Sequence, residues 1–528
     1  MTETIWEKHS LRHFVLKSPL AGTAFAVCLG ALTVLTFPPF SFLLLAPITY
    51  GALFLKLRGS SLFRSALIGW TFGLGYFAGG LLWIAESFFV DAERFGLFAV
   101  PAVAGLSALL AVFPALASFA FVALARHRLA DGLAGPLLFA TCWTVAEWLR
   151  GHVLTGFPWN LSGYALAEYD APRQLASWVG SYGLGFLFVF SVILPAHWIA
   201  NRSCVRRSGI ALTMALIAGL WGAGQARLWL GSEEPIGTTV RIVQGNVAQR
   251  EKWRPDLRAE TVSRYIELSN RGNDPDILLW PETAYPGYLD EVATDRERIV
   301  RSLSRTGILM TGVPDRVEAA TGTLYFNTIQ AFDAKGRNLG GYAKHKLVPF
   351  GEYVPFREWL PLGRLTTSLG DFTSGPGPRT LALPDVPFVG LAICYEIIFP
   401  GHVVDDAIRP DWIFNATNDA WFGTSIGPEQ HLAAARMRAV EEGLPVLRAA
   451  NTGISAIIDA KGRVLARLGL EQTGVLDTLL PPTLPRTPYA RFGDWMILPL
   501  VLTAWLLVIC LPATVVCVRQ LMATRKGF

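Results

Sequence analysis

The first half of the chain consists of long uncharged stretches separated by short polar ones. From Ser18 to Leu55 there is no charged residue, and Pro38-Pro39 interrupts this run near its middle, which predicts two helices joined by a tight turn. A bilayer-spanning helix needs about 20 mainly apolar residues, and most uncharged stretches reach or approach that length; 132–146 needs Glu147-Trp148-Leu149 to complete it. The pattern predicts eight membrane spans, at 19–37, 40–55, 65–85, 95–125, 132–146, 174–200, 208–226 and 495–518.

The short loops between these spans predict the orientation of the chain, because cytoplasmic loops carry an excess of Lys and Arg. Every predominantly basic loop falls on the same side of the predicted membrane. Both termini are therefore predicted to be cytoplasmic, and residues 227–494 to lie on the opposite face. The basic residues are Lys8, Arg12, Lys17, Lys56, Arg58, Arg64, Arg126, Arg128, Arg202, Arg206, Arg207, Arg519, Arg525 and Lys526.

The polar segment 227–494 alternates short apolar runs, typical of strands, with amphipathic stretches typical of helices. Such alternation indicates an α/β domain of stacked layers. The chain is thus predicted to contain a seven-helix transmembrane region (1–226), an extracytoplasmic α/β domain (227–494), and an eighth span with a cytoplasmic tail (495–528). The expected strands are 238–246, 277–280, 307–311, 324–331, 347–349, 388–394, 411–415 and 454–458, and the expected helices are 255–272, 291–305 and 428–442.

Composition agrees with a membrane protein. Hydrophobic residues make up 52% of the chain and charged residues 16%, and the mean hydropathy is +0.38, which is too apolar for an ordinary soluble protein. The net charge of +5 carries no argument for nucleic-acid binding. The six cysteines form no CxxC pair and no metal-ligand spacing with the eight histidines, so neither a metal nor another cofactor is predicted.

Candidate chemistry lies in the polar segment, where one apolar run leads into Cys394 and another into Glu282. A thiol at the end of a strand beside a carboxylate suits nucleophilic catalysis, although free cysteine is also among the most buried residue types. A third stretch supplies Lys344 and, eight residues later, Glu352. The combination favours a nucleophile over a core cysteine.

In this order the three residues resemble the Glu-Lys-Cys triad of the nitrilase, or carbon-nitrogen hydrolase, superfamily. The surrounding motifs are similar to signatures of the apolipoprotein N-acyltransferase family. They read Trp-Pro-Glu-Thr at 280–283, Lys-x-x-Leu-Val-Pro-Phe-Gly-Glu-Tyr-Val-Pro at 344–355, and Cys-Tyr-Glu at 394–396. The resemblance implies a four-layer αββα sandwich for the polar segment, which periodicity alone does not show.

The resemblance also implies roles and substrates. Cys394 is the expected nucleophile, Glu282 the base that takes its proton, and Lys344 the charge that favours the thiolate and the developing oxyanion. An acyl chain would pass from a phospholipid, typically phosphatidylethanolamine, to the α-amino group of a diacylglyceryl-cysteine apolipoprotein. The implied location is the bacterial inner membrane, with the α/β domain on the periplasmic face.

Six further residues are supporting or substrate-binding candidates. Glu352 and Glu396 are expected to orient Lys344 or the acceptor amine, although each could equally be a solvated surface charge. Trp159 lies in an aromatic loop at 155–161 that is similar to the family's Gly-Phe-Pro-Trp loop. This likeness favours lipid contact, and an interfacial belt residue is the alternative. The remaining candidates, which rest on the resemblance, are Tyr395, Trp253 and Asn327.

Two other functions stay open from the sequence. One is a membrane-tethered amidase or nitrilase that releases acid to water. The other is a lipid-binding or transport protein with a catalytically dead outer domain, against which the intact Glu282, Lys344 and Cys394 weigh, as does the scarcity of charge within the spans. Acyl transfer to a diacylated peptide, against release of free acid or ammonia, distinguishes the acyltransferase from the hydrolase.

Overall fold

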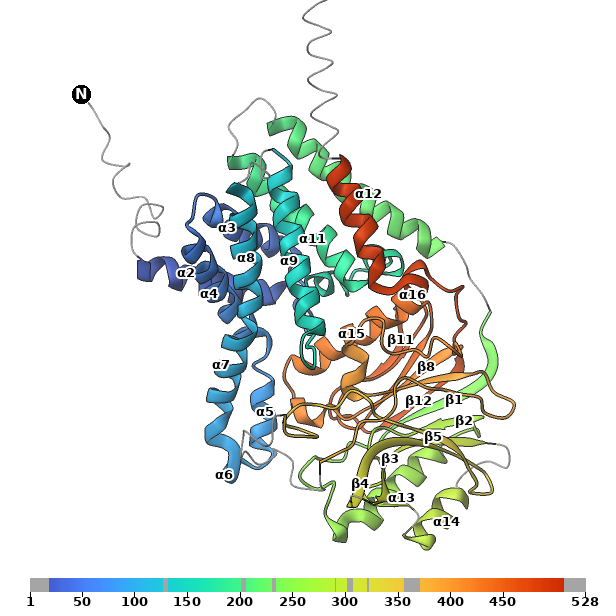
Figure 1. Ribbon diagram of the computed structural model, residues 1–528. Helices are drawn as coiled ribbons and strands as arrows, with labels where there is room; N and C mark the ends of the chain where they lie inside the picture. Colours follow the sequence, from blue (N-terminus) through green and yellow to red (C-terminus); the bar gives the residue numbers. More distant parts are fainter. Residues whose placement is uncertain are drawn as a thin grey trace, which may run out of the picture.

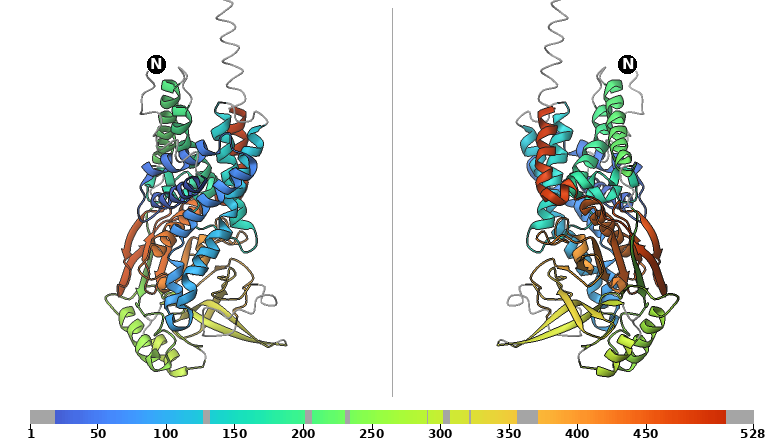
Figure 2. Two further views of the ribbon diagram at one scale, coloured as in Figure 1. Left: turned by 90° about the vertical axis from the view of Figure 1, so that its left-hand side faces the viewer. Right: turned by 90° about the vertical axis from the view of Figure 1, so that its right-hand side faces the viewer.

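The computed structural model describes residues 19–126, 132–200, 206–229, 234–289, 291–301, 307–320, 322–355 and 371–507. Within this part of the chain, residues up to 229 are mainly helical and later residues form two β-sheets with flanking helices (Figure 1). Most helices of the first half gather on one side of the sheets, whereas residues 84–110 extend alongside them, and the helix that begins at Pro488 returns to the first side (Figure 2). Trp505 of this last helix donates a hydrogen bond of 3.3 Å to Thr141.

The helices of the first half follow the uncharged stretches of the sequence. They are α2 (Pro19–Thr33), α3 (Ala46–Leu57), α4 (Leu62–Gly80), α5 (Ile84–Phe89), α6 (Ala92–Phe95), α7 (Ala99–Leu110), α8 (Val112–Leu124), α9 (Ala134–His152), α10 (Asp170–Arg173), α11 (Ala176–Ala200) and α12 (Arg206–Trp229). We call residues 19–229 the helical region.

Four described helical stretches are long and apolar enough to cross a membrane, and they coincide with the predicted spans 95–125, 174–200, 208–226 and 495–518. The predicted spans 19–37 and 40–55 hold shorter apolar helices, and 65–85 and 132–146 lie on α4 and α9. The arrangement of eight spans therefore stays a prediction. The four helical stretches are Ala92–Leu124, Ala176–Ala200, Gly209–Trp229 and Pro488–Leu507.

Glycines let two helices of this region approach each other closely. A Cβ atom at Gly30 of α2 would lie 1.9 Å from the carbonyl oxygen of Phe72 in α4, and one at Gly75 of α4 would lie 2.0 Å from that of Val27. Small residues at such crossings allow backbone-to-backbone packing in apolar surroundings. Any larger residue at either position would push α2 and α4 apart.

The second half of the chain forms two six-stranded sheets, with strand orders β12-β1-β2-β3-β4-β5 and β11-β10-β9-β8-β7-β6. Strands β1 to β3 run parallel in the first sheet, and β7 to β9 in the second. The strands are β1 (Ile236–Gln244), β2 (Ile277–Leu279), β3 (Ile308–Ala319), β4 (Gly322–Asp333), β5 (Asn338–Ala343), β6 (Thr380–Leu381), β7 (Val389–Ile393), β8 (Trp412–Thr417), β9 (Val446–Ala450), β10 (Ser455–Ile458), β11 (Val464–Leu468) and β12 (Gly474–Leu480).

The two sheets pack face to face and carry helices on their outer faces. Ile242 and Leu279 of the first sheet share one buried cluster with Leu391 and Phe414 of the second. The first sheet packs on its other face against α13 (Arg258–Ser269) and α14 (Ala293–Arg301), and the second against α15 (Gly427–Glu442). The implied four-layer αββα sandwich is thereby confirmed.

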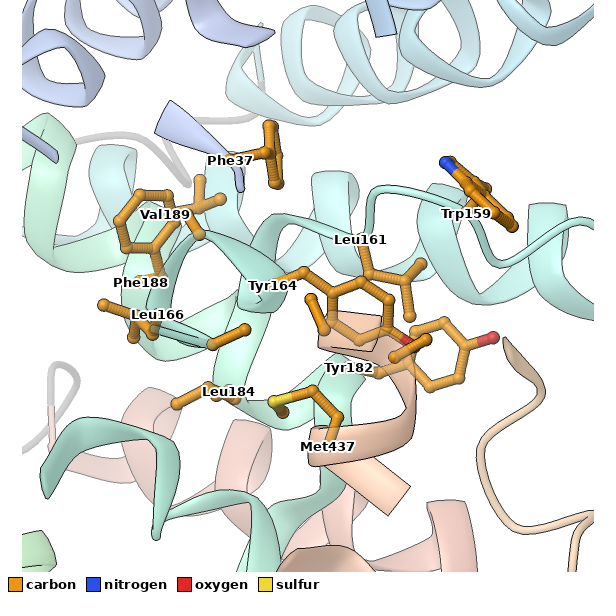
Figure 3. Close-up of a cluster of buried hydrophobic side chains, with 14 of the residues drawn as sticks. Phe37, Trp159, Leu161, Tyr164, Leu166, Tyr182, Leu184, Phe188, Val189 and Met437 are labelled. Atoms are coloured by element: carbon orange, nitrogen blue, oxygen red, sulfur yellow. The ribbon is translucent and has the colours of Figure 1, made fainter. Parts of the chain in front are cut away.

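Helix α15 also packs against the helical region, so it is buried on all sides. Figure 3 shows Met437 of α15 beside Tyr164, Tyr182 and Leu184 of the helical region. The side chain of Ser181 donates a hydrogen bond of 2.6 Å to the buried Glu441. These contacts join the α/β domain to the helical region through α15.

One predicted strand is wrong. Residues 347–349 form no strand in the described chain; only an isolated bridge joins Pro349 and Tyr353. The strand before this turn is β5, whose glycines Gly340 and Gly341 weaken the apolar pattern that sequence reading relies on. Strands β5, β6, β9, β11 and β12 were not predicted. Of these, β6, β9 and β11 pair with a neighbouring strand of the chain, and β12 pairs with the distant β1.

Candidate active site

Cys394 lies where the predicted strand ends. It follows β7 directly and begins a short 3-10 turn, η8 (Cys394–Ile398), with a backbone φ of 48°. A residue with a Cβ seldom adopts this left-handed conformation, and such positions occur at functional sites. Only 7% of the residue is exposed. The sharp turn from strand to helix therefore presents a buried thiol at the end of the strand.

Glu282, Lys344, Glu352 and Asn327 come together beside this turn. The Lys344 Nζ lies 2.9 Å from a carboxylate oxygen of Glu352 and 3.7 Å from Oε1 of Glu282. The Asn327 amide, on β4, donates to Glu282 at 2.7 Å and to Glu352 at 2.9 Å. Both carboxylates are thus held in the cluster, and Glu352 is not a solvated surface charge.

The charges of this cluster act on the thiol. Burial and the Glu282 carboxylate together raise the pKa of Cys394 to about 12, although Lys344 opposes the increase. The resting thiol is therefore protonated near neutral pH, and a base must remove its proton during attack. Burial alone would lower the pKa of Lys344, but Glu352 and Glu282 outweigh burial and raise it above its ordinary value. Lys344 remains a cation.

A second lysine reaches the cluster. Lys252 is buried, and its Nζ donates a hydrogen bond of 2.9 Å to the backbone carbonyl of Glu282. Burial lowers the pKa of Lys252 to about 8, although Glu282 and Cys394 counteract the effect. In the sequence, Lys252 is marked only by its position next to the candidate residue Trp253. The structure shows Trp253 half-buried.

Glu396 is 1% exposed and bonded on both oxygens, so the alternative of a solvated surface charge is wrong. It accepts hydrogen bonds from the Tyr342 hydroxyl at 2.6 Å and from the backbone N–H groups of Ile393, His345 and Lys346. Burial would raise the pKa of Glu396, but His345 and these hydrogen bonds lower it below its ordinary value. The carboxylate ties the segment after Lys344 to the strand end before Cys394.

The loop after α9 reaches the active site from the helical region. The Tyr395 hydroxyl donates to the Gly156 carbonyl at 3.2 Å, and the Tyr395 ring stacks on Phe157. Arg150 holds the loop from inside the helical region, since it donates 2.7 Å hydrogen bonds to the carbonyls of Phe157 and Trp159. The loop thus contacts the residue next to the nucleophile.

Trp159 lies inside the protein. Only 3% of the residue is exposed, and its indole N–H donates a hydrogen bond of 2.7 Å to Gln430 of α15. Its ring also packs against Trp83 and Phe422. An interfacial belt residue would keep one edge at the membrane surface, so that alternative does not describe Trp159. The same burial leaves the side chain no surface for the predicted lipid contact in this structure.

Comparison with known proteins gives the family. Residues 29–194 match the domain described as "Apolipoprotein N-acyltransferase N-terminal domain", and residues 239–486 match "Carbon-nitrogen hydrolase". An apolipoprotein N-acyltransferase of Rhodopseudomonas palustris is 39% identical over 492 residues, which cover 89% of this chain and 91% of that protein. The chain belongs to the apolipoprotein N-acyltransferase family. The resemblance read from the motifs is confirmed.

A second relative agrees with this membership. The apolipoprotein N-acyltransferase of Bradyrhizobium diazoefficiens is 41% identical over 493 residues, covering 89% of this chain and 91% of that protein. Among solved structures, an amidase from Nesterenkonia sp. AN1 is 21% identical and covers 46% of this chain and 93% of its own, with a TM-score of 0.33.

Three buried polar residues near Cys394 were not assigned to the site from the sequence. They are Asp419, His431 and Arg448. His431 of α15 faces the Cys394 carbonyl oxygen and Asp419, and Arg448 of β9 donates to Asp419 at 2.6 Å. Potential ligand atoms of Cys394, Asp419 and His431 lie within 4.8 Å of one another. Asp419 and His431 already have protein hydrogen-bond partners, so this group is built as a hydrogen-bonded network.

Proposed function

We propose that this protein transfers an acyl chain from a membrane phospholipid, through a thioester at Cys394, to the N-terminal α-amino group of a diacylglyceryl-cysteine apolipoprotein. Family membership supports the activity. The observation that carries the proposal for this chain is the buried cluster in which Glu282 and Lys344 act electrostatically on Cys394. A nucleophile, a base and a fixed cation are what covalent acyl transfer requires.

The first half-reaction forms the thioester. Glu282 takes the thiol proton as the Cys394 sulfur attacks the ester carbonyl carbon, and Lys344 stabilises the negative charge on the carbonyl oxygen. The carbon–oxygen bond of the ester then breaks, and Glu282 returns its proton to the leaving lysophospholipid oxygen. Because Asn327 and Glu352 hold Glu282 and Lys344 in place, base and cation are positioned before the substrate arrives.

In the second half-reaction, Glu282 again passes a proton from the attacking group to the leaving group. The acceptor amine attacks the thioester carbonyl carbon, Glu282 takes a proton from the amine, and the carbon–sulfur bond breaks to form the amide. The sulfur leaves as a thiolate and recovers its proton from Glu282. Phosphatidylethanolamine is the donor that the family resemblance implies, and the scheme predicts ping-pong kinetics.

Phospholipid supplied without an acceptor should distinguish transfer from hydrolysis. We expect one equivalent of lysophospholipid per enzyme, with the acyl chain retained on Cys394, because the contacts of Tyr395 and Phe157 place apolar surface beside the thioester. The measurement is quantification of lysophospholipid and free fatty acid over time, with location of the acyl group by peptide mass. Steady release of fatty acid over many turnovers would instead support a membrane-tethered amidase or nitrilase-type hydrolase.

We also propose that the protein is a multi-pass protein of the bacterial inner membrane with eight spans, cytoplasmic termini, and its α/β domain on the periplasmic face. The predicted spans and the one-sided basic loops support this topology. The contact between α15 and the helical region suits a domain resting on the membrane surface.

Cysteine labelling tests this topology with two exposed sites. Lys335, in the turn between β4 and β5, is predicted to be periplasmic, and Arg58, after α3, cytoplasmic. In spheroplasts, a membrane-impermeant maleimide should label the Lys335→Cys variant, and label the Arg58→Cys variant only after the membrane is disrupted. The unchanged protein gives the background from native cysteines. Equal labelling of both variants in intact spheroplasts would contradict the topology.

A further inference from the structure

The peptide bond between Cys394 and Tyr395 is held from one edge by a buried histidine. The Nε2 atom of His431 lies 3.1 Å from the carbonyl oxygen of Cys394. His431 has no exposed surface. A carbonyl oxygen can only accept a hydrogen bond, so Nε2 carries the hydrogen in this contact.

The other nitrogen of His431 keeps this arrangement in either protonation state. Nδ1 lies 3.0 Å from an Arg448 guanidinium nitrogen and 2.9 Å from Asp419 Oδ1. A neutral imidazole with its hydrogen on Nε2 accepts from Arg448 at Nδ1, and a protonated imidazole donates from Nδ1 to Asp419. In both states the Nε2–H group faces the Cys394 carbonyl.

Aromatic rings hold the imidazole in this orientation. The ring centroids of Trp159 and Phe422 lie 5.7 Å and 5.6 Å from that of His431. Trp159 belongs to the loop that Arg150 holds in the helical region. The direction of the His431 side chain is therefore set jointly by α15 and by the helical region.

A fixed carbonyl also fixes the amide on the other side of the same peptide. Peptide units are planar and almost always trans, so the C=O of Cys394 and the N–H of Tyr395 point in opposite directions. Holding the carbonyl toward His431 turns the Tyr395 N–H away from His431. Oxyanion holes need a donor in a fixed direction, because a donor that must reorient during the reaction stabilises the transition state less.

We propose that His431 is a positioning residue for the reaction: by holding the Cys394 carbonyl, it aims the Tyr395 N–H at the oxyanion formed on the acyl carbonyl, opposite Lys344. This rests on the proposed acyl transfer through Cys394. His431 has no direct contact with substrate in this assignment. It acts only through the peptide plane, and Asp419 and Arg448 act through His431.

Two amide variants isolate the contact. In the His431→Gln variant the side-chain amide can reach the position of Nε2 and donate to the Cys394 carbonyl. In the His431→Asn variant, which is one methylene shorter, the amide reaches only the position of Nδ1. Both variants keep a polar, uncharged group of similar kind in the same cavity, so they serve as each other's control.

Two rates are measured for each variant with the full-length protein in detergent. The first is single-turnover release of lysophospholipid from phosphatidylethanolamine, which passes through an oxyanion. The second is alkylation of Cys394 by iodoacetamide, a displacement at carbon that forms no oxyanion. Since loss of an oxyanion donor typically costs about 10²- to 10³-fold in rate, we expect His431→Asn to slow lysophospholipid release by roughly 10²-fold and His431→Gln to retain most of it. Alkylation should stay close to the unchanged rate in both.

The outcomes are distinguishable. Equal acylation rates in the two variants would overturn the positioning role, and so would a parallel loss of acylation and alkylation, which would mean that His431 acts on the thiol. Unfolding would accelerate alkylation, because Cys394 is buried in the folded protein. Absence of lysophospholipid release from the unchanged protein would contradict the proposed function itself rather than the role of His431.

Discussion

Replacement of Cys394 by alanine should abolish the acyl-enzyme and reduce acyl transfer by roughly 10⁴- to 10⁶-fold, the scale seen when the nucleophile of a hydrolytic triad is removed. The sulfur is the atom to which the acyl chain would be attached, and neither Glu282 nor Lys344 can replace it without a new covalent route. The measurement is transfer of labelled acyl chain from phospholipid to the protein and then to a diacylated peptide. Alanine also has a Cβ, so the backbone strain at φ 48° is unchanged.

The matched control is Cys142→Ala, because Cys142 is also a buried cysteine but lies on α9 in the helical region. This variant should retain labelling and transfer. Acyl label that persists in the Cys394→Ala protein would refute the assignment of the nucleophile. Loss of activity in both variants, with lowered melting temperatures, would show that cysteine packing and not chemistry is being measured.

Replacement of Lys344 by methionine should produce the second largest loss of acyl transfer, and it should also lower the stability of the protein. The substitution removes the cation 2.9 Å from Glu352 and 3.7 Å from Glu282. Loss of a positioned charge that stabilises an oxyanion costs about 10²- to 10³-fold in rate. Breaking a buried ion pair by removing one partner destabilises a protein by about 3–5 kcal/mol. Single-turnover acylation and the thermal midpoint measure the two losses separately.

A double variant separates the two effects. Adding Glu352→Gln to Lys344→Met removes one of the two carboxylates left without a cation, while the amide can still bond Asn327. The thermal midpoint should recover in part, and acylation should remain as slow as in the single variant. Recovery of acylation would show that Lys344 serves only to neutralise the carboxylates and that the oxyanion is stabilised by other groups.

The active site lies at the ends of strands of the α/β domain, but it also depends on contacts with the helical region. Tyr395 bonds the Gly156 carbonyl, and Trp159 packs on His431, so the residue after Cys394 and the histidine that contacts the Cys394 carbonyl both touch one loop. Arg150 fixes that loop. A change at Arg150, in the last turn of α9, would therefore reach the nucleophile through a short chain of buried contacts.

The sequence by itself determined the features that depend on local pattern. Apolar runs ending on Glu282 and Cys394 predicted two strand ends correctly, because a buried strand needs only a few consecutive apolar residues to be recognised. The uncharged stretches predicted helices for the same reason. The motifs around Lys344 indicated the family, and with it the αββα sandwich that periodicity could not show.

Tertiary structure alone decided which charges are buried and what they face. Arg438 and Glu441 of α15 look like the solvated face of an amphipathic helix, yet they form a fully buried ion pair of 3.0 Å because the helical region covers that face. His431 likewise acquires its orientation from Trp159, which lies 272 positions earlier in the chain. Burial of a polar group depends on partners brought from distant segments, and no local pattern of hydrophobic and polar residues records those partners.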